Sequence, residues 1–242
     1  MSIVNLYDLL PEQYRVPQES YENYDKVRIS LPMRTCIVAP SGAGKTNLCL
    51  NLLGQINAFT KIYIIARSFD TEPWLIDGIR EMEEKLSKKT RGEVKILMLA
   101  TNTLEDLPEI DDFDPSERNL IIFDDLVTET SKVLLKKMAD LWIRGRRQNC
   151  STLYLSQDYH GIPAIMRRNT THLLLKALGT TYEKRAILRE SARDMTKEQM
   201  DAMFRSAEPE KLENFFLIDM SSAAALDPSL RYRRNFEPIM DM

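Results

Sequence analysis

A glycine-rich stretch near the start of the chain constrains the fold more than any other feature. A short apolar run, Cys36–Val38, leads into the small residues of APSGAGKT at 39–46, and a leucine-rich helical pattern follows at once. Small residues let successive backbone N–H groups turn inward around a phosphate, and the helix directs its positive end at the same anion. The order of strand, loop and helix therefore predicts a phosphate-binding loop.

The residues of this loop have distinct chemical tasks. Lys45 is expected to reach the β- and γ-phosphates of ATP, and the Thr46 hydroxyl to bind Mg²⁺. Ala39 stands where the pattern G-x-x-x-x-G-K-[ST] has its first glycine, so position 39 must avoid positive φ angles. The tripeptide Gly-Lys-Thr alone is weak evidence, but its strand and helix context supports the motif. The predicted nucleotide-binding residues are Ser41, Gly42, Ala43, Gly44, Lys45, Thr46 and Asn47.

A second motif supplies the acids that such a loop requires. The apolar run 120–123 ends in Asp124 and Asp125. We expect Asp124 to hold Mg²⁺ through its water shell, and Asp125 to accept a proton from the attacking water or to orient it. Two solvated acids at the start of a loop are the ordinary alternative, which the upstream loop disfavours. Gln157, after the apolar run 151–155, suits a hydrogen bond to the γ-phosphate or the water, unless it is an ordinary polar residue at a strand end.

The remaining periodicity predicts an α/β fold. Helical spacing appears at 74–90, 132–144, 181–192 and 196–206, and 102–118 is a polar surface loop. Apolar runs predict further strands at 61–66, 94–99, 172–175, 215–218 and 230–236. Solid apolar strands that alternate with helices indicate a mostly parallel central sheet flanked by helices, with functional groups at the carboxyl ends of the strands.

Composition places the chain in a broad class. With 242 residues, 43% hydrophobic and 29% charged, it is long enough for one domain or at most two small ones. Residues 1–30 carry Tyr7, Tyr14, Tyr21 and Tyr24 and read as an arm on the domain or on a neighbour, or as plain packing. Residues 31–242 read as the nucleotide-binding domain.

No apolar run reaches the length of a membrane span, and the N-terminus lacks the pattern of a signal peptide, so we expect a soluble intracellular protein. The three scattered cysteines, Cys36, Cys49 and Cys150, are expected to be reduced core residues, because their number and spacing suit neither a disulfide framework nor a metal site.

Charge limits how the chain could contact nucleic acid. A net charge of −3 argues against a surface coated with basic residues, although local contact is compatible with it. Arginines crowd into 144–168 and 231–234. Lys85, Lys88, Lys89 and Arg91 are candidate residues for such a local contact, although a solvated helix end explains them equally well.

The motifs APSGAGKT, LIIFDDL and GRRQNCSTLYLSQD together resemble the FtsK/HerA superfamily of P-loop motors. Within it, the chain is most similar to the genome-packaging ATPases of poxvirus-related large DNA viruses, virophages and double-jelly-roll viruses. The resemblance covers about residues 33–178. It implies a RecA-like P-loop NTPase with an additional strand, in which the strand before Gln157 lies between the glycine-loop strand and the Asp124 strand. Many superfamily members have Glu where this chain has Asp125, so here the water must sit closer or be placed by Gln157.

The resemblance also implies an oligomer. Ring-shaped assemblies, hexamers or pentamers, would hold ATP at subunit boundaries. The turn before the strand that leads to Gln157, a residue expected to sense the γ-phosphate, would supply an arginine to the neighbour's ATP. Arg146 occupies that position, with Arg144 and Arg147 as competing candidates. The ordinary alternative is that these arginines end a helix and complement its negative end.

The expected function is ATP-driven translocation of double-stranded DNA into a preformed viral capsid, with capsid proteins as partners. We expect the protein to be located in the viral factory of the host-cell cytoplasm and in the virion. One rival is a nucleoside or nucleotide kinase, which needs an acceptor pocket and does not respond to DNA. Another is an assembly protein whose nucleotide switches its oligomeric state. An ABC-type ATPase is disfavoured because no LSGGQ-like signature occurs.

Overall fold

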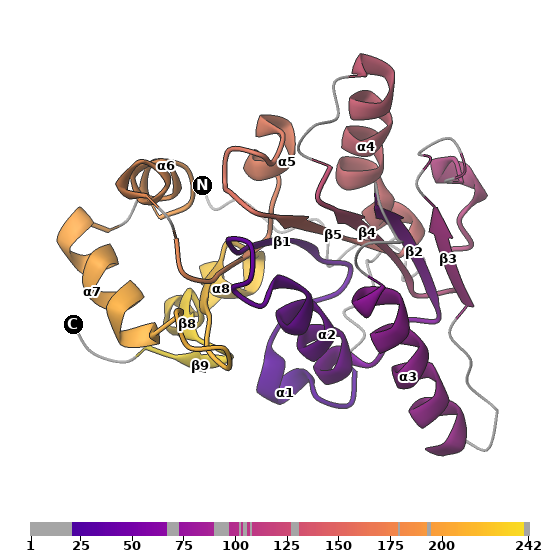
Figure 1. Ribbon diagram of the computed structural model, residues 1–242, viewed down its shortest axis with the longest axis horizontal. Helices are drawn as coiled ribbons and strands as arrows, with labels where there is room; N and C mark the ends of the chain where they lie inside the picture. The colour runs from indigo at the N-terminus through magenta and orange to yellow at the C-terminus, as the bar shows by residue number, and fades with distance from the viewer. Residues whose placement is uncertain are drawn as a thin grey trace, which may run out of the picture.

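A single sheet organises the molecule (Figure 1). The computed structural model describes residues 21–66, 73–89, 97–101, 103, 106, 108–126, 131–178, 180–192 and 195–239. Within these residues the sheet has nine strands in the order β3-β2-β4-β5-β1-β6-β7-β8-β9. The strands are β1 (Arg34–Val38), β2 (Lys61–Ala66), β3 (Leu97–Thr101), β4 (Asn119–Asp124), β5 (Cys150–Ser156), β6 (His172–Leu175), β7 (Phe216–Asp219), β8 (Tyr232–Arg234) and β9 (Glu237–Pro238).

Helices connect the strands. The α-helices are α1 (Tyr24–Val27), α2 (Lys45–Ile56), α3 (Trp74–Lys89), α4 (Lys132–Arg144), α5 (Ala164–Arg168), α6 (Thr181–Ser191), α7 (Lys197–Ala207) and α8 (Ser222–Leu226). Short 3₁₀ helices are η4 (Ile110–Asp112), η5 (Gly145–Gln148) and η6 (Pro228–Leu230). The described helices include none long and apolar enough to cross a bilayer.

The sheet is parallel from β3 to β6, and β7, β8 and β9 are added to it antiparallel. This confirms the predicted mostly parallel sheet. β5 lies between β4 and β1, the order that the resemblance implied. All seven residues of β5 are buried, as expected of a central strand covered on both faces.

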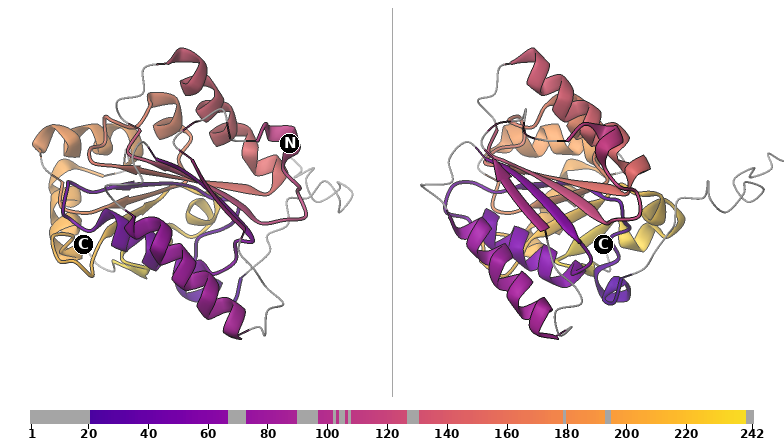
Figure 2. Two further views of the ribbon diagram at one scale, coloured as in Figure 1. Left: turned by 45° about the vertical axis from the view of Figure 1, so that its right-hand side comes forward. Right: turned by 90° about the vertical axis from the view of Figure 1, so that its right-hand side faces the viewer.

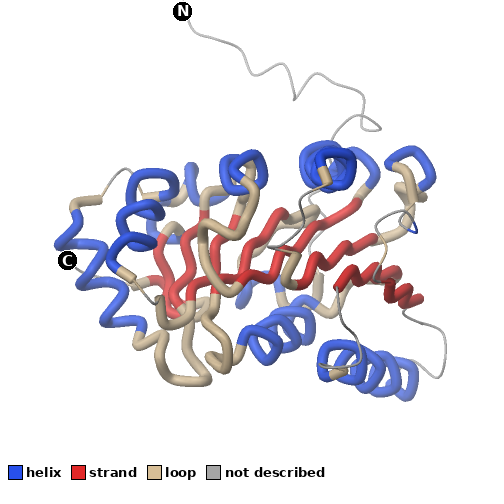
Figure 3. The backbone as a smooth tube through the Cα atoms, turned by 45° about the horizontal axis from the view of Figure 1, so that its top comes forward, coloured by secondary structure: helices blue, strands red, loops and turns tan. Residues whose placement is uncertain are grey.

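The core consists of two apolar layers, one on each face of the sheet. Alternate strand residues point to opposite faces, so Phe123 joins the layer under α4, α5, α6 and α7, whereas its neighbour Ile122 joins the layer under α2 and α3. Figures 2 and 3 show α4 and the pair α2 and α3 on opposite sides of the strands. Cys36, Cys49 and Cys150 are buried in these layers as free thiols.

Three local predictions differ from the structure. β3 ends at Thr101, two residues beyond the expected end, whereas residues 94–96 of the expected strand lie outside the described residues. The single strand expected over 230–236 is wrong, because Asn235, with a φ of 57°, separates β8 from β9. Helices α5 and α8 were not predicted, since five residues are too few to display a helical period.

The described part of the expected arm packs on the domain. Tyr21, Val27 and Ile29 are buried in the same apolar layer as α2. The Tyr21 hydroxyl donates to the carbonyl of Ile29 at 3.0 Å, and the Arg233 guanidinium on β8 donates to the carbonyl of Val27 at 2.8 Å. Residues 1–20 lie outside the described residues.

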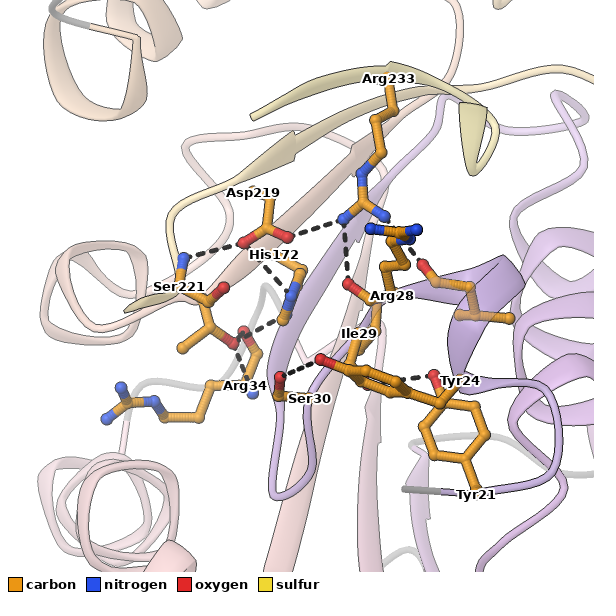
Figure 4. A network of polar contacts seen from close by, with 12 residues as sticks. Tyr21, Tyr24, Arg28, Ile29, Ser30, Arg34, His172, Asp219, Ser221 and Arg233 are labelled. Atoms are coloured by element: carbon orange, nitrogen blue, oxygen red, sulfur yellow. Dashed lines mark hydrogen bonds and ion pairs between the residues drawn. The ribbon is translucent and has the colours of Figure 1, made fainter. Parts of the chain in front are cut away.

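A buried polar network lies where this segment meets the sheet (Figure 4). Asp219 at the end of β7 accepts a 2.7 Å hydrogen bond from Arg233 and a 2.9 Å bond from the Ser221 backbone, and His172 Nε2 lies 3.4 Å from it. The Asp219, Arg233 and His172 side chains are at most 1% exposed. His172 opens β6 at the edge opposite the glycine loop, so this network supports the far end of the sheet.

Candidate nucleotide-binding site

The glycine loop begins as an extension of β1. The Ala39 N–H donates to the carbonyl of Ser156 at 3.0 Å, which continues the β1–β5 ladder by one residue. Ala39 is fully buried and is not among the described non-glycine residues with positive φ, in agreement with the requirement set by its side chain. The left-handed turns fall later, at Gly42 (φ +75°) and Gly44 (φ +88°).

The loop then passes into α2 in a form suited to an anion. Gly44 is the N-cap of α2 and supplies no side-chain cap, and the first turn contains no acidic residue. The unpaired N–H groups and the positive end of the helix therefore stay available to a phosphate. A Cβ at Gly42 would meet nothing within 4 Å, so the space beside this glycine is open, and its positive φ is what requires glycine there.

Four side chains from three elements meet above this loop. Lys45 Nζ lies 3.5 Å from Asp124 Oδ1 and 4.0 Å from Asp125 Oδ2. Gln157 Nε2 donates to Asp125 Oδ2 at 2.5 Å. The Lys45 and Asp124 side chains are 12% and 14% exposed, whereas that of Asp125 is 38% exposed. The sheet brings them together because β1, β4 and β5 are parallel neighbours that end at the same edge.

Oxygen donors suited to Mg²⁺ are present at this edge. Thr46 is the second residue of α2, beside Lys45, and Asp124 ends β4. A hydroxyl and a carboxylate are the hard oxygen ligands that Mg²⁺ takes in nucleotide sites, where it keeps several waters and binds phosphate oxygens. The donor set therefore fits the expected metal.

Arg146 lies at the opposite edge of the sheet. It belongs to η5, directly before β5, and its side chain is exposed, like those of Arg144 and Arg147. The pKa of Arg34, at the start of β1, is lowered first by the burial of Arg34 and further by the positive charge of Arg146. Because β5 has seven residues at about 3.3 Å each, Arg146 lies about 20 Å from the glycine loop of its own chain.

Several basic residues noted in the sequence have partners within the chain. Arg233 is buried against Asp219, and Arg234 pairs with Glu208 at 2.8 Å. Arg167 pairs with Glu190 at 2.9 Å. On α3, Lys85 and Lys88 form exposed pairs with Glu81 and Glu84. The side chain of Lys89 and the whole of Arg91 lie outside the described residues. The cluster 231–234 is therefore not a free basic patch.

Comparison with known proteins assigns the chain to a family. The family model described as "Poxvirus A32 protein" matches residues 21–219, which include the glycine loop, the acidic pair, Arg146 and Gln157. The chain belongs to the poxvirus A32 protein family. This confirms the family that the motifs predicted, and the protein is accordingly an ATPase. No curated protein matches the chain significantly.

Solved structures of similar fold include B204, the DNA-packaging ATPase from Sulfolobus turreted icosahedral virus, with a TM-score of 0.55 and 10% identity over 86% of this chain and 98% of that one. The genome-packaging NTPase B204 from Sulfolobus turreted icosahedral virus 2 matches over the same shares of the two chains. Its complex with AMP gives a TM-score of 0.53 at 10% identity, and its complex with sulfate gives 0.53 at 12%. At these identities the likeness establishes the P-loop NTPase fold.

Sequence reasoning missed one part of the site's surroundings. Lys176, directly after β6, is 1% exposed and donates to backbone carbonyls of the segment 208–214. The only local signal is a lysine that closes a solid apolar strand, and that pattern does not reveal what the amine binds.

Proposed function

We propose that the protein is an ATP-driven translocase that packages double-stranded viral DNA into a preformed capsid. Membership of the poxvirus A32 family and the fold shared with viral packaging NTPases support this proposal. The observation that carries it is the meeting of Lys45, Asp124, Asp125 and Gln157 at one edge of the sheet, since these groups are the ones ATP hydrolysis needs. Residues 31–242 would form the ATPase domain and residues 1–30 its arm.

The residues take the following roles. The loop 41–47 surrounds the phosphates, and Lys45 neutralises the charge that develops on the β- and γ-oxygens. Asp125 orients the attacking water and accepts its proton. Gln157 responds to the γ-phosphate and, through its bond to Asp125, fixes the direction of that carboxylate.

Thr46 and Asp124 would hold Mg²⁺, which when bound shields the charge of the β- and γ-phosphates. Lys45 reaches Asp124 from the loop side and keeps this carboxylate facing the phosphate site.

The position of Arg146 supports action on a neighbouring subunit. An arginine about 20 Å from its own glycine loop is too far to touch ATP bound there. In a ring, the exposed η5 turn of one subunit would reach the nucleotide of the next. An arginine supplied in trans contributes about 10³ to 10⁵ in turnover rate, so an isolated subunit should hydrolyse ATP slowly.

The DNA would be held through its phosphates, without base readout, because packaging must accept every sequence in the genome. A ring directs basic segments inward while its exterior stays acidic, which reconciles DNA binding with the net charge of −3. Capsid proteins would be the second partner, in the viral factory of the host-cell cytoplasm and in the virion.

The decisive experiment is ATP hydrolysis by the purified protein over a range of protein concentrations, with and without double-stranded DNA of two unrelated sequences. Lys45→Ala serves as the blank. Stimulation by both DNAs together with a steep concentration dependence is expected. Turnover that ignores DNA but rises with a nucleoside or nucleotide acceptor would make the protein a kinase. Very slow turnover throughout would instead indicate a nucleotide-switched assembly protein.

A further inference from the structure

One wall beside the glycine loop is formed by the segment 208–214, which connects α7 to β7. A buried lysine holds this segment in place. Lys176 Nζ donates to the carbonyls of Lys211, Leu212 and Asn214, each at 2.8 Å. The Lys176 backbone N–H donates to the carbonyl of Val38, the last residue of β1, at 2.9 Å. One residue thus joins the segment directly to the strand that carries the glycine loop.

The segment is also braced by its own contacts. Two successive turns shape it, with the N–H of Lys211 bonded to the carbonyl of Glu208 and the N–H of Asn214 bonded to that of Lys211, each at 3.0 Å. The Asn235 amide bonds to the Asn214 side chain at 3.3 Å. An element fixed at so many points holds its exposed side chains at defined positions.

Leu212 projects from this wall towards the loop. Leu212 is 61% exposed, one of the large apolar residues that the described structure leaves open to solvent. A Cβ built on Gly44 would lie 2.7 Å from Leu212 Cδ1, so the leucine touches the backbone of the loop beside Lys45. An exposed leucine on a rigid wall next to a phosphate site gains stability when an apolar ligand surface covers it.

The sheet order shows which part of a nucleotide would arrive there. Asp125 and Gln157, which face the γ-phosphate, follow β4 and β5 on one side of β1. Leu212 belongs to the segment that Lys176 ties to β6, on the other side of β1. A nucleotide whose γ-phosphate lies over β4 and β5 therefore extends its nucleoside across the loop towards Leu212.

The charges around Leu212 also favour a nucleoside over a phosphate group at this position. Glu210 and Glu213 flank it and are exposed, and Lys211 is paired with Glu208. These acids would repel phosphate groups, whereas a neutral base and sugar suffer no such repulsion.

We propose that Leu212 is the apolar platform for the nucleoside of bound ATP and ADP, and that Lys176 is the residue that positions it. The proposal rests on nucleotide binding by the glycine loop and deepens the proposed function by assigning its nucleoside subsite. Removal of the leucine should lower the affinity for ligands that carry a nucleoside and leave the affinity for ligands that consist of phosphate alone unchanged.

The test is the binding of ADP and of inorganic pyrophosphate, both with Mg²⁺, by isothermal titration calorimetry. The two ligands share the diphosphate and differ by the adenosine. Leu212→Ala should weaken the binding of ADP by about 5- to 10-fold, as expected for loss of a partly covered leucine surface. The affinity for pyrophosphate should stay unchanged. Leu212→Met should retain the ADP affinity, because it keeps an apolar surface of similar volume.

Two further variants complete the design. Val133→Ala removes another exposed apolar side chain, 76% exposed on α4, and should leave both ligands unaffected. Lys176→Met should lower ADP affinity selectively if the variant folds, as checked by circular dichroism. Equal losses for ADP and pyrophosphate in Leu212→Ala, or no loss for either, would overturn the proposal. These titrations need neither DNA nor a ring, so a failure of DNA-stimulated turnover in the wild type would count against the translocase alone.

Discussion

The side-chain amide of Gln157 bonds to the carboxylate of Asp125 across the ends of β5 and β4, although the two residues are 32 positions apart in sequence. The Asp125 backbone is fixed as well, since its N–H donates to the carbonyl of Leu155 at 3.1 Å. Its φ of 51° lies in the left-handed region, which aspartate and asparagine tolerate better than other non-glycine residues. The carboxylate is thus held by its own backbone and by the neighbouring strand.

Asp125→Asn separates the chemical role of this residue from its structural one. Asparagine tolerates the same left-handed backbone but is not a base, so turnover should fall by about 10²- to 10⁴-fold. The free energy of unfolding should change by less than about 0.5 kcal/mol. Steady-state ATP hydrolysis and urea unfolding measure the two effects. Asp125→Ala, in contrast, should lose activity and also about 1 kcal/mol of stability to backbone strain. Near-normal turnover in Asp125→Asn would assign the base elsewhere.

Gln157→Ala should reduce kcat while KM for ATP stays close to the wild-type value. The amide is expected to act on the γ-phosphate and the water, so its loss removes stabilisation of the transition state and about 10²- to 10³-fold in rate. Asn169→Ala is the matched control, because this amide at the end of α5 bonds to the carbonyl of Ile165 and lies away from the loop. A rise in KM with unchanged kcat would show that Gln157 serves binding instead.

Arg146→Ala should remove most turnover, by about 10³- to 10⁵-fold, and spare nucleotide binding by the same subunit. Arg144→Ala and Arg147→Ala test the two competing candidates, Arg144 at the end of α4 and Arg147 beside Arg146 in η5, both of them exposed; each variant should keep most of the turnover. Mixing Arg146→Ala subunits with Lys45→Ala subunits should restore part of the activity, because a mixed ring contains boundaries with an intact loop and an intact arginine. Absence of any recovery, or loss of ADP binding by Arg146→Ala, would contradict action in trans.

The parts of the fold that sequence predicts well are those specified by neighbouring residues. A short stretch of sequence is enough to recognise the glycine loop, the apolar run before Asp124 and the amphipathic pattern of α4. The bounds predicted for β2, β6 and α4 are those of the structure. The position of Gln157 beside Asp125 was also predictable, because parallel strands end at one edge and a polar residue after a buried strand falls near the loop.

Contacts between distant segments could not be predicted in the same way. Arg233 looks like one member of a basic tail, yet the antiparallel pairing of β8 with β7 buries it against Asp219. Lys176 bonds to a segment 35 to 38 residues further on, and nothing near it in sequence specifies that partner. Such charges become buried only when the sheet register brings their partners alongside.

Asp219→Asn should destabilise the protein by about 3 to 5 kcal/mol, because it leaves the buried Arg233 guanidinium without its counter-charge. Urea unfolding at neutral pH measures the loss. Glu208→Gln is the control: the side chains of its partners Arg234 and Lys211 are 44% and 49% exposed, and little change is expected. Equal small effects for both variants would mean that the pair at Asp219 contributes no more than a surface ion pair.

The same carboxylate should make stability depend on pH in the acid range. Burial by itself raises the pKa of Asp219, but the charge and hydrogen bond of His172 and hydrogen bonding by Ser221 outweigh it and lower the pKa from 3.8 to about 2. A folded-state pKa below the unfolded one means that the contribution is present above about pH 4 and is lost as pH falls towards 2. The shift corresponds to about 2 to 3 kcal/mol. Wild-type stability, measured by urea unfolding between pH 6 and pH 2, should therefore fall more steeply than that of Asp219→Asn. Parallel pH profiles for the two proteins would show that Asp219 does not cause this acid sensitivity.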